Sequence, residues 1–249
     1  MNVLLRGGVA IACLALPGLL AASNDAAASG GSRTAAMQFE MWREGPTEAC
    51  GTKCRAWVSA SGAFTSDTPR DFEAFARGRD LRGMTLVLDS IGGSVTGAIG
   101  LGRAIRRLDM TTTVGRTVPL AAIKGQVPRA TLSTDASCES MCAFVLLGGA
   151  RRFVPPEAQV LVHQIWLGDR RDDAIAASYT AEDLMIVQRD IGRIALFTAE
   201  MGGSIDLLDV ALRIPPWEPM RALSYDEIQR MRLSTVANPF EPAEPAPVV

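Results

Sequence analysis

The sequence predicts an α/β fold in which helices pack on a parallel sheet. Short apolar runs alternate with segments of helical periodicity over residues 37–236. Such alternation is typical of parallel βαβ units. One run, residues 84–88, is apolar almost throughout, which indicates a strand buried on both faces of a sheet. Polar residues follow several expected strands, at the edge where parallel folds carry their active groups.

The expected strands are short, and each ends at a turn or at polar residues. The first precedes a turn at Gly62, and the second runs into Asp89 and Ser90. The last is followed directly by His163, the only histidine of the chain. In chain order, we expect strands at residues 55–60, 84–88, 111–114 and 159–162.

The expected helices are marked by their first residues and by apolar side chains at helical spacing. Thr68-Pro69 is typical of a helix start, and Thr180 with Asp183 is typical of an N-cap. Further helices are expected after Gly93 and over residues 141–147. The expected inner faces are Ala98, Leu101, Ile105 and Leu108 after Gly93, and Leu184, Val187, Ile191 and Ile194 after Thr180.

The composition is that of an ordinary globular protein. Of the 249 residues, 48% are apolar and 21% are charged. This length suits one large domain or two small ones. The formal net charge is -2, and no segment forms a basic stripe, so we expect no nucleic-acid partner.

The N-terminus is typical of an export signal. Arg6 is the only charged side chain before the apolar run of residues 7–22, which is short for a membrane span. We expect a signal peptide at residues 1–23, with an uncleaved anchor as the alternative, and a linker at 24–36. The protein would then be periplasmic, and it would contact the inner membrane only if the signal segment stayed in place. Residues 237–249 are rich in proline and are expected to form a disordered tail.

Cysteine usage agrees with export. Removal of the signal segment takes away Cys13 and leaves Cys50, Cys54, Cys138 and Cys142, an even number that favours disulfides. Four cysteines allow three connectivities, and a four-thiolate zinc site is the rival interpretation. We expect the pair Cys50–Cys54 most firmly, because a bridge between Cys138 and Cys142 on one helical turn would be strained.

Three local motifs hold residues with catalytic chemistry. Gly92-Gly93 lets backbone N–H groups approach an oxyanion, although such a pair is more often a tight turn. Ser140 stands directly before an apolar helix, where it could be a nucleophile or, more commonly, an N-cap. His163 could be the base that a nucleophilic serine needs, although a lone histidine is more often structural.

The order of these motifs resembles the proteolytic subunit of Clp protease (ClpP). Residues 89–95 read Asp-Ser-Ile-Gly-Gly-Ser-Val and are similar to that family's Asn-Ser-Pro-Gly-Gly-Ser-Val. Glu139-Ser140-Met141 resembles the family's Ala-Ser-Met around the nucleophile. Leu161-Val162-His163-Gln164 resembles its Met-Ile-His-Gln around the base. The resemblance covers roughly residues 55–233 and is closer still to uncharacterised periplasmic bacterial proteins related to that subunit.

The resemblance implies a ClpP/crotonase-type fold, with repeated ββα units and a parallel-sheet core, over residues 37–236. It also implies that Ser140 is the nucleophile and His163 the general base, and that the N–H groups of Gly93 and Met141 form the oxyanion hole. A homo-oligomer is the family's habit. An unfoldase ATPase partner is not expected, because those enzymes work in the cytosol.

The chain departs from the family in two places. The connection between Gly115 and Ser140 is longer than the family's. The family's third catalytic residue is an aspartate before a Leu-Ser turn, and aligning Leu223-Ser224 with that turn puts Pro216 or Met220 in its place. Other carboxylates that could orient the histidine are Asp206, Asp209 and Glu218.

Three functions are therefore weighed. An exported serine hydrolase, most simply a peptidase without metal or cofactor, would use Ser140 and His163 on a peptide or protein substrate. A non-catalytic binding or assembly protein could keep the fold without the aspartate. A crotonase-like acyl-CoA enzyme would use the oxyanion hole alone, but CoA thioesters are cytosolic, and export argues against them.

Overall fold

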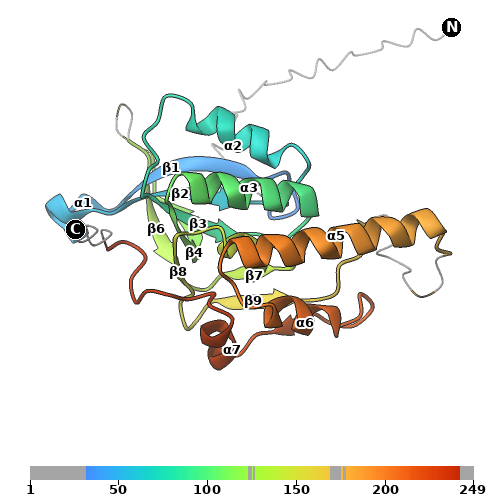
Figure 1. The fold of residues 1–249 in the computed structure, drawn as a ribbon. Helices are drawn as coiled ribbons and strands as arrows, with labels where there is room; N and C mark the ends of the chain where they lie inside the picture. Colours follow the sequence, from blue (N-terminus) through green and yellow to red (C-terminus); the bar gives the residue numbers. More distant parts are fainter. Residues whose placement is uncertain (1–31, 123–124, 126, 169–174, 176–177, 242–249) are drawn as a thin grey trace, which may run out of the picture.

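The computed structural model describes residues 32–122, 125, 127–168, 175 and 178–241, and it confirms the α/β class (Figure 1). The strands are β1 Gln38–Glu44, β2 Ala56–Ser61, β3 Thr85–Asp89, β4 Thr111–Val114, β5 Arg116–Pro119, β6 Arg129–Ser133, β7 Ser137–Glu139, β8 Arg151–Phe153, β9 Gln159–Val162 and β10 Arg221–Ala222. The helices are α1 Thr47–Cys50, the 3-10 turn η1 Gly51–Lys53, α2 Thr68–Ala76, α3 Val95–Arg107, α4 Met141–Leu146, α5 Ala181–Glu200, α6 Asp206–Leu212 and α7 Tyr225–Arg230.

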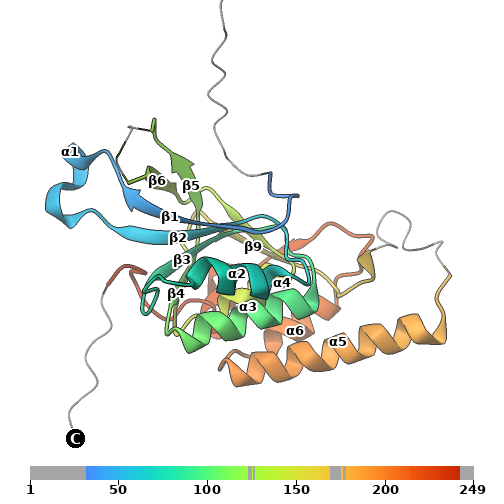
Figure 2. The ribbon, with the colours of Figure 1, turned by 90° about the horizontal axis from the view of Figure 1, so that it is seen from above.

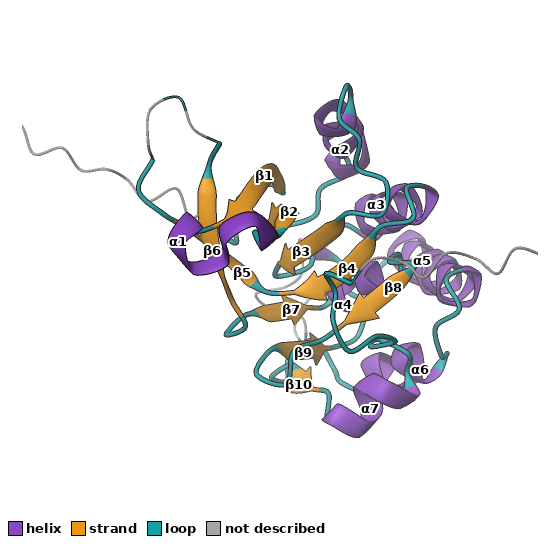
Figure 3. Cartoon of the chain, turned by 90° about the vertical axis from the view of Figure 1, so that its left-hand side faces the viewer, coloured by secondary structure: helices purple, strands orange, loops and turns teal. Residues whose placement is uncertain are grey.

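The strands form two sheets, which adjoin at β7 (Figure 3). The 7-stranded sheet has the order β5-β6-β1-β2-β3-β4-β8, and β2, β3, β4 and β8 pair in parallel. The 3-stranded sheet has the order β10-β9-β7, with β7 and β9 parallel. A β-bridge between Ser90 and Cys138 connects the end of β3 to β7. The carboxyl ends of strands from both sheets are therefore brought to one place.

The expected strands and helices are all present, with ends that differ by a residue or so. β3 is buried along its whole length, as its apolar run predicts. On α3, the side chains of Ala98, Leu101 and Ile105 are buried against the sheet and against α4. Thr180 caps α5 through a capping box with Asp183. Strand β1 was not expected from the sequence; it pairs antiparallel with β2 and parallel with β6.

The expected inner face of α5 is fully buried only toward the C-terminal end of the helix. Ile194 is fully buried, but Leu184 is 55% exposed, and Val187 and Ile191 are only partly covered. Figure 2 shows the N-terminal half of α5 extending beyond the body of the fold. Periodicity identifies the apolar face of a helix, but it does not show how far along that face a partner reaches.

Short segments next to the expected domain also pack on it. In the expected linker, Ala36 forms a β-bridge with Ala63. In the expected tail, the Thr85 hydroxyl donates to the Pro239 carbonyl at 2.6 Å, and the Phe240 ring lies 6.3 Å from that of Trp57. The tail therefore contacts the sheet as far as Phe240, while residues 1–31 and 242–249 lie outside the described part. Within the described residues, no helix has both the length and the apolar character that crossing a bilayer requires.

Candidate active site

Ser140 and His163 lie side by side because β7 and β9 are paired in parallel. Glu139 is opposite Leu161 in this pairing, so the residues that follow the two strands emerge at the same edge. The Ser140 Oγ lies 2.8 Å from the His163 Nε2. At this distance the serine hydroxyl can donate to an unprotonated Nε2, which is the arrangement that a nucleophile and its base require. The predicted pair is thus brought together.

Ser140 has an unusual backbone conformation at the start of α4. Its φ is 54° and its ψ is -121°, a region that L-residues rarely occupy. Its N–H donates to the Leu161 carbonyl at 2.8 Å, and its carbonyl accepts from the Ala143 N–H at 3.1 Å. These two hydrogen bonds tie the serine to β9 on one side and to α4 on the other. The turn therefore aims the hydroxyl at the base instead of using it to cap the helix.

The Gly92-Gly93 turn packs directly against the serine. Gly92 has a φ of 91°, and a Cβ built on it would lie 2.7 Å from the Cβ of Ser140. Gly93 has a φ of 131°, and its Cβ would lie 2.3 Å from the Phe64 carbonyl oxygen. Only glycine fits at these two positions, so the glycine pair is required by close approach as well as by backbone conformation.

Two backbone N–H groups at this junction are unused. Among the described residues, neither the Gly93 N–H nor the Met141 N–H donates to a protein acceptor. Both residues line the same pocket as Ser140 and His163. Met141 is also the first residue of α4, where the helix dipole favours negative charge. This arrangement can bind an oxyanion formed next to the Ser140 hydroxyl.

The pocket at the Ser140–His163 pair has a volume of about 640 Å³, within the range of small-molecule and peptide side-chain sites. Its apolar wall includes Ile91, Met141 and Trp166. The indole of Trp166 packs edge-on against that of Trp217, with ring centroids 6.5 Å apart. The pocket can therefore take an apolar group beside the reacting atoms.

The carboxylates considered for the third catalytic position have different surroundings. Glu218 lines the pocket together with Pro216 and Met220, the two residues at the aligned position of the family's aspartate. Asp209 instead pairs with Arg213 at 2.8 Å on the exposed side of α6. A further acid that sequence reasoning missed, Asp190 of α5, also lines the pocket and pairs with Arg193 at 3.1 Å.

The four cysteines of the described chain form two disulfides. Cys50 is bonded to Cys54, and Cys138 to Cys142. Because all four sulfurs are paired, the zinc interpretation is wrong, and the described residues contain no group of three potential metal ligands. Strain in the Cys138–Cys142 bridge was expected on the assumption that both cysteines lie on one helical turn. That assumption is wrong, since Cys138 is in strand β7 and only Cys142 is helical. Disulfides are typical of proteins in an oxidising, non-cytoplasmic compartment.

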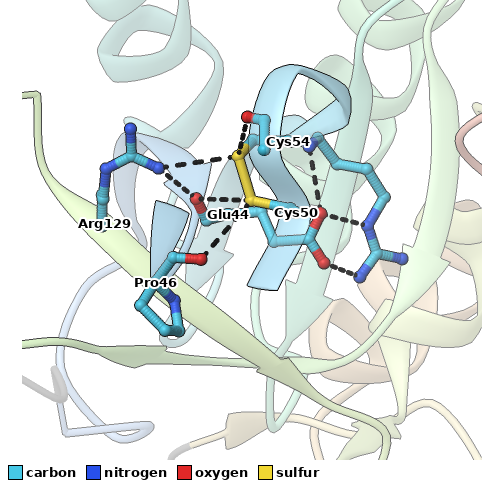
Figure 4. Close-up of a disulfide and its surroundings, with 7 residues drawn as sticks. Glu44, Pro46, Cys50, Cys54 and Arg129 are labelled. Carbon is cyan, nitrogen blue, oxygen red and sulfur yellow. Dashed lines mark hydrogen bonds and ion pairs between the residues drawn. A yellow bond between two sulfur atoms is a disulfide. The ribbon is translucent and has the colours of Figure 1, made fainter. Parts of the chain in front are cut away.

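The two disulfides have different environments. Cys50–Cys54 lies in the α1–η1 turn, where Cys54 Sγ is 3.8 Å from the Arg129 guanidinium and Glu44 accepts hydrogen bonds from Arg55 (Figure 4). Figure 1 shows α1 at the opposite end of the sheet from α5. Cys138 and Cys142 are fully buried and flank Ser140.

One residue beside the site was not anticipated. Arg33, in the expected linker, pairs with Asp89 at 2.8 Å and with Glu139 at 2.9 Å. Asp89 precedes the glycine turn and Glu139 precedes Ser140, so one guanidinium bridges both segments of the candidate oxyanion hole. A single arginine in a Ser/Gly/Ala-rich stretch gives no local signal of such a role.

Comparison with family models and with curated proteins gives no family or function for this chain. The chain matches none of the protein-family models. A search of curated proteins found no significant match either.

Proposed function

We propose that this protein is an exported serine hydrolase, most simply a ClpP-like peptidase, that works through a Ser140 acyl-enzyme. The observation that carries the proposal is the 2.8 Å contact between the Ser140 Oγ and the His163 Nε2. It occurs at a serine held with positive φ at the start of a helix, next to a pocket. A serine that only capped α4 would have no need of this backbone conformation or of a basic partner.

In the proposed reaction, His163 removes the hydroxyl proton as the Ser140 Oγ attacks a substrate carbonyl carbon. The carbonyl electrons move to oxygen, and the N–H groups of Gly93 and Met141 donate to that oxyanion. In enzymes where such a donor was removed, the loss was about 3 kcal/mol. The protonated His163 then gives its proton to the leaving amine or alcohol. Water hydrolyses the acyl-enzyme by the same steps, with His163 as base again.

A non-catalytic binding protein is the competing proposal. It is favoured by Pro216 and Met220, which stand where the resembled family has its aspartate. The pocket would then bind a peptide segment without cleaving it. A crotonase-like acyl-CoA enzyme would need the oxyanion hole but not the Ser–His contact, so that contact weighs against it.

Labelling with a fluorophosphonate probe separates these functions. We expect the oxidised protein, expressed without residues 1–23, to be labelled, and Ser140→Ala to abolish labelling because it removes the nucleophile. His163→Ala should slow labelling at least about 100-fold, because the general base is lost. The matched control is Ser66→Ala, an exposed turn serine, which should be labelled at the wild-type rate.

Thermal melts of each variant show whether the fold is kept. A folded, oxidised wild-type protein that is not labelled would contradict the hydrolase proposal and favour the binding protein. Labelling that persists in Ser140→Ala would show that another residue reacts. Binding of a CoA thioester without labelling would point to the acyl-CoA enzyme.

A further inference from the structure

The Cys138–Cys142 disulfide surrounds the proposed nucleophile. Each cysteine is two residues from Ser140, so the serine is the middle residue of a covalently closed loop. Both cysteines are fully buried, within the same hydrophobic core cluster. The covalent bond therefore restricts the backbone on both sides of the proposed nucleophile.

The conformation of Ser140 needs support that local hydrogen bonding supplies only in part. A positive φ is unfavourable for an L-residue and persists where the surroundings impose it. The helix that follows, α4, has only 6 residues, and a helix this short depends on its tertiary contacts. The disulfide joins the strand before the serine to the first turn of that helix, and so restricts both sides of the turn.

The disulfide also connects the three parts of the site. Cys138 lies opposite Val160 in β9, the strand that leads to His163. Cys138 also forms a β-bridge with Ser90, which lies in the segment that leads to Gly93. Cys142 follows Met141, the other expected oxyanion donor. A bond between these two cysteines therefore fixes the nucleophile relative to the base and to both N–H donors.

Loop length argues that this bond serves the site more than global stability. Cross-linking stabilises a fold by restricting the unfolded chain, and the effect grows with the length of the closed loop. The two disulfides have the same sequence separation of 4, so both close short loops, for which this effect is smallest. They differ in location: only Cys138–Cys142 encloses a residue of the site.

We propose that the Cys138–Cys142 disulfide is a positioning element for Ser140, and that the chain reaches full reactivity only when this bond is formed. The proposal rests on the hydrolase function proposed above. A chain that stayed reduced would keep its sheet and helices but would hold the serine less firmly against His163. The activity would thereby be confined to compartments that support disulfides.

The test compares two double variants that each remove one disulfide, Cys138→Ala/Cys142→Ala and Cys50→Ala/Cys54→Ala. We expect the first to be labelled by a fluorophosphonate at least about tenfold more slowly than the wild type, because small misplacements of a nucleophile are costly. The maximal labelling rate should fall while the half-saturating probe concentration stays the same. The second variant should be labelled within about twofold of the wild-type rate.

Each outcome has a distinct meaning. A folded Cys138→Ala/Cys142→Ala protein labelled at the wild-type rate would overturn the positioning role and leave the hydrolase proposal intact. A variant that cannot fold would also overturn it, since the bond would then be needed by the whole domain. If the wild-type protein itself is not labelled, the hydrolase proposal fails, and the positioning role fails with it.

Discussion

Two groups of arginine side chains in this molecule hold their surroundings by different means. Arg106 of α3 and Arg152 of β8 donate to backbone carbonyls, whereas Arg33 and Arg116 form ion pairs with carboxylates, to which Arg33 adds a hydrogen bond to the Ser137 carbonyl. The first group binds carbonyls just after α4 and α5 end, and the second pairs with acids in the segments that lead to Gly93 and Ser140. Arg106 and Arg152 therefore stabilise the fold, whereas Arg33 and Arg116 stabilise the candidate site.

Arg106 and Arg152, the carbonyl-binding pair, bind carbonyl groups at the C-terminal ends of two helices. Arg152 is 4% exposed and donates to the carbonyls of Leu147 and Met201, just after α4 and α5 end. Arg106 donates to the same two carbonyls and to those of Gly148 and Gly149. A positive charge at the C-terminal ends of helices is favoured by their dipoles. Burial is nonetheless unfavourable for the charge, since it lowers the pKa of Arg152 to about 10, with a smaller contribution from Arg106.

The carboxylate-binding group is less buried. The side chain of Arg33 is 27% exposed, while that of its partner Asp89 is only 7% exposed. Asp89 also pairs with Arg116 at 3.2 Å, so two guanidinium groups neutralise one buried carboxylate and a second, less buried one, Glu139. These contacts require ionised acids, whereas carbonyl oxygens accept at any pH. The fold and the site should therefore respond differently to substitution and to acid.

The largest effect should follow loss of Arg152. We expect Arg152→Met to lower the free energy of unfolding by about 2 kcal/mol, because hydrogen bonds from a charged donor to two buried carbonyls are lost. Urea unfolding measures this change. The neighbouring Arg151→Met is the control and should cost less than about 1 kcal/mol, since the hydrogen bond from its side chain to the Glu241 carbonyl is exposed. Equal losses in both variants would contradict a special role for the carbonyl-binding pair.

Arg33→Gln should lower the free energy of unfolding less than Arg152→Met does, but it should slow fluorophosphonate labelling more. Removing the two ion pairs of this partly exposed arginine should cost about 1 kcal/mol of unfolding free energy. Fluorophosphonate labelling should slow severalfold, because the segments that carry Gly93 and Ser140 lose their shared partner. Arg33→Lys should recover part of that rate.

The matched control for Arg33 is another arginine ion pair, neither residue of which lines the pocket. Arg103 of α3 pairs with Glu200 of α5 at 2.8 Å, and both side chains are more than one-third exposed. Arg103→Gln should change the unfolding free energy by less than about 0.5 kcal/mol and leave labelling unchanged. Slower labelling in Arg103→Gln would contradict a specific role for Arg33 at the site.

Acid should reveal a further difference in stability, at the start of α7. The Ser224 N–H and, next, the Arg221 guanidinium hold the pKa of Glu227 below its usual value. Its contribution to stability is therefore present above the unfolded pKa of about 4.3 and is lost as the pH falls through the folded pKa. The stability difference between wild type and Glu227→Gln should be about 1 kcal/mol near pH 7 and should shrink below about pH 4.

The same pH series measured with Arg152→Met sharpens the comparison. Neither Arg152 nor its carbonyl partners change charge in that range, so its stability difference should stay constant between about pH 4 and pH 7. A difference that shrank in parallel with that of Glu227→Gln would mean that an unrecognised acid supports Arg152.

The sequence allowed the serine and the histidine to be predicted, but not the side chains that support them. Ser140 directly precedes an apolar helix, and His163 directly follows an apolar strand. Both elements can be recognised from the residues next to these two. Arg33 contacts the Ser137 carbonyl, 104 residues away, and no local pattern reports a contact of that range. The pairing of β1 with β2 and β6 is likewise set by tertiary packing, which single-sequence periodicity does not contain.

The aromatic wall of the pocket gives the protein a built-in optical reporter. Trp166 lines the pocket, and Trp217, 53% exposed, packs against it, whereas Trp42 and Trp57 are buried in the β1–β2 pair. Exposed indoles emit at longer wavelengths than buried ones. A ligand that fills the pocket will therefore change the red part of the intrinsic emission and leave the blue part as an internal reference. Candidate peptides can be screened for binding by their effect on this spectrum, without a label and before any turnover is known.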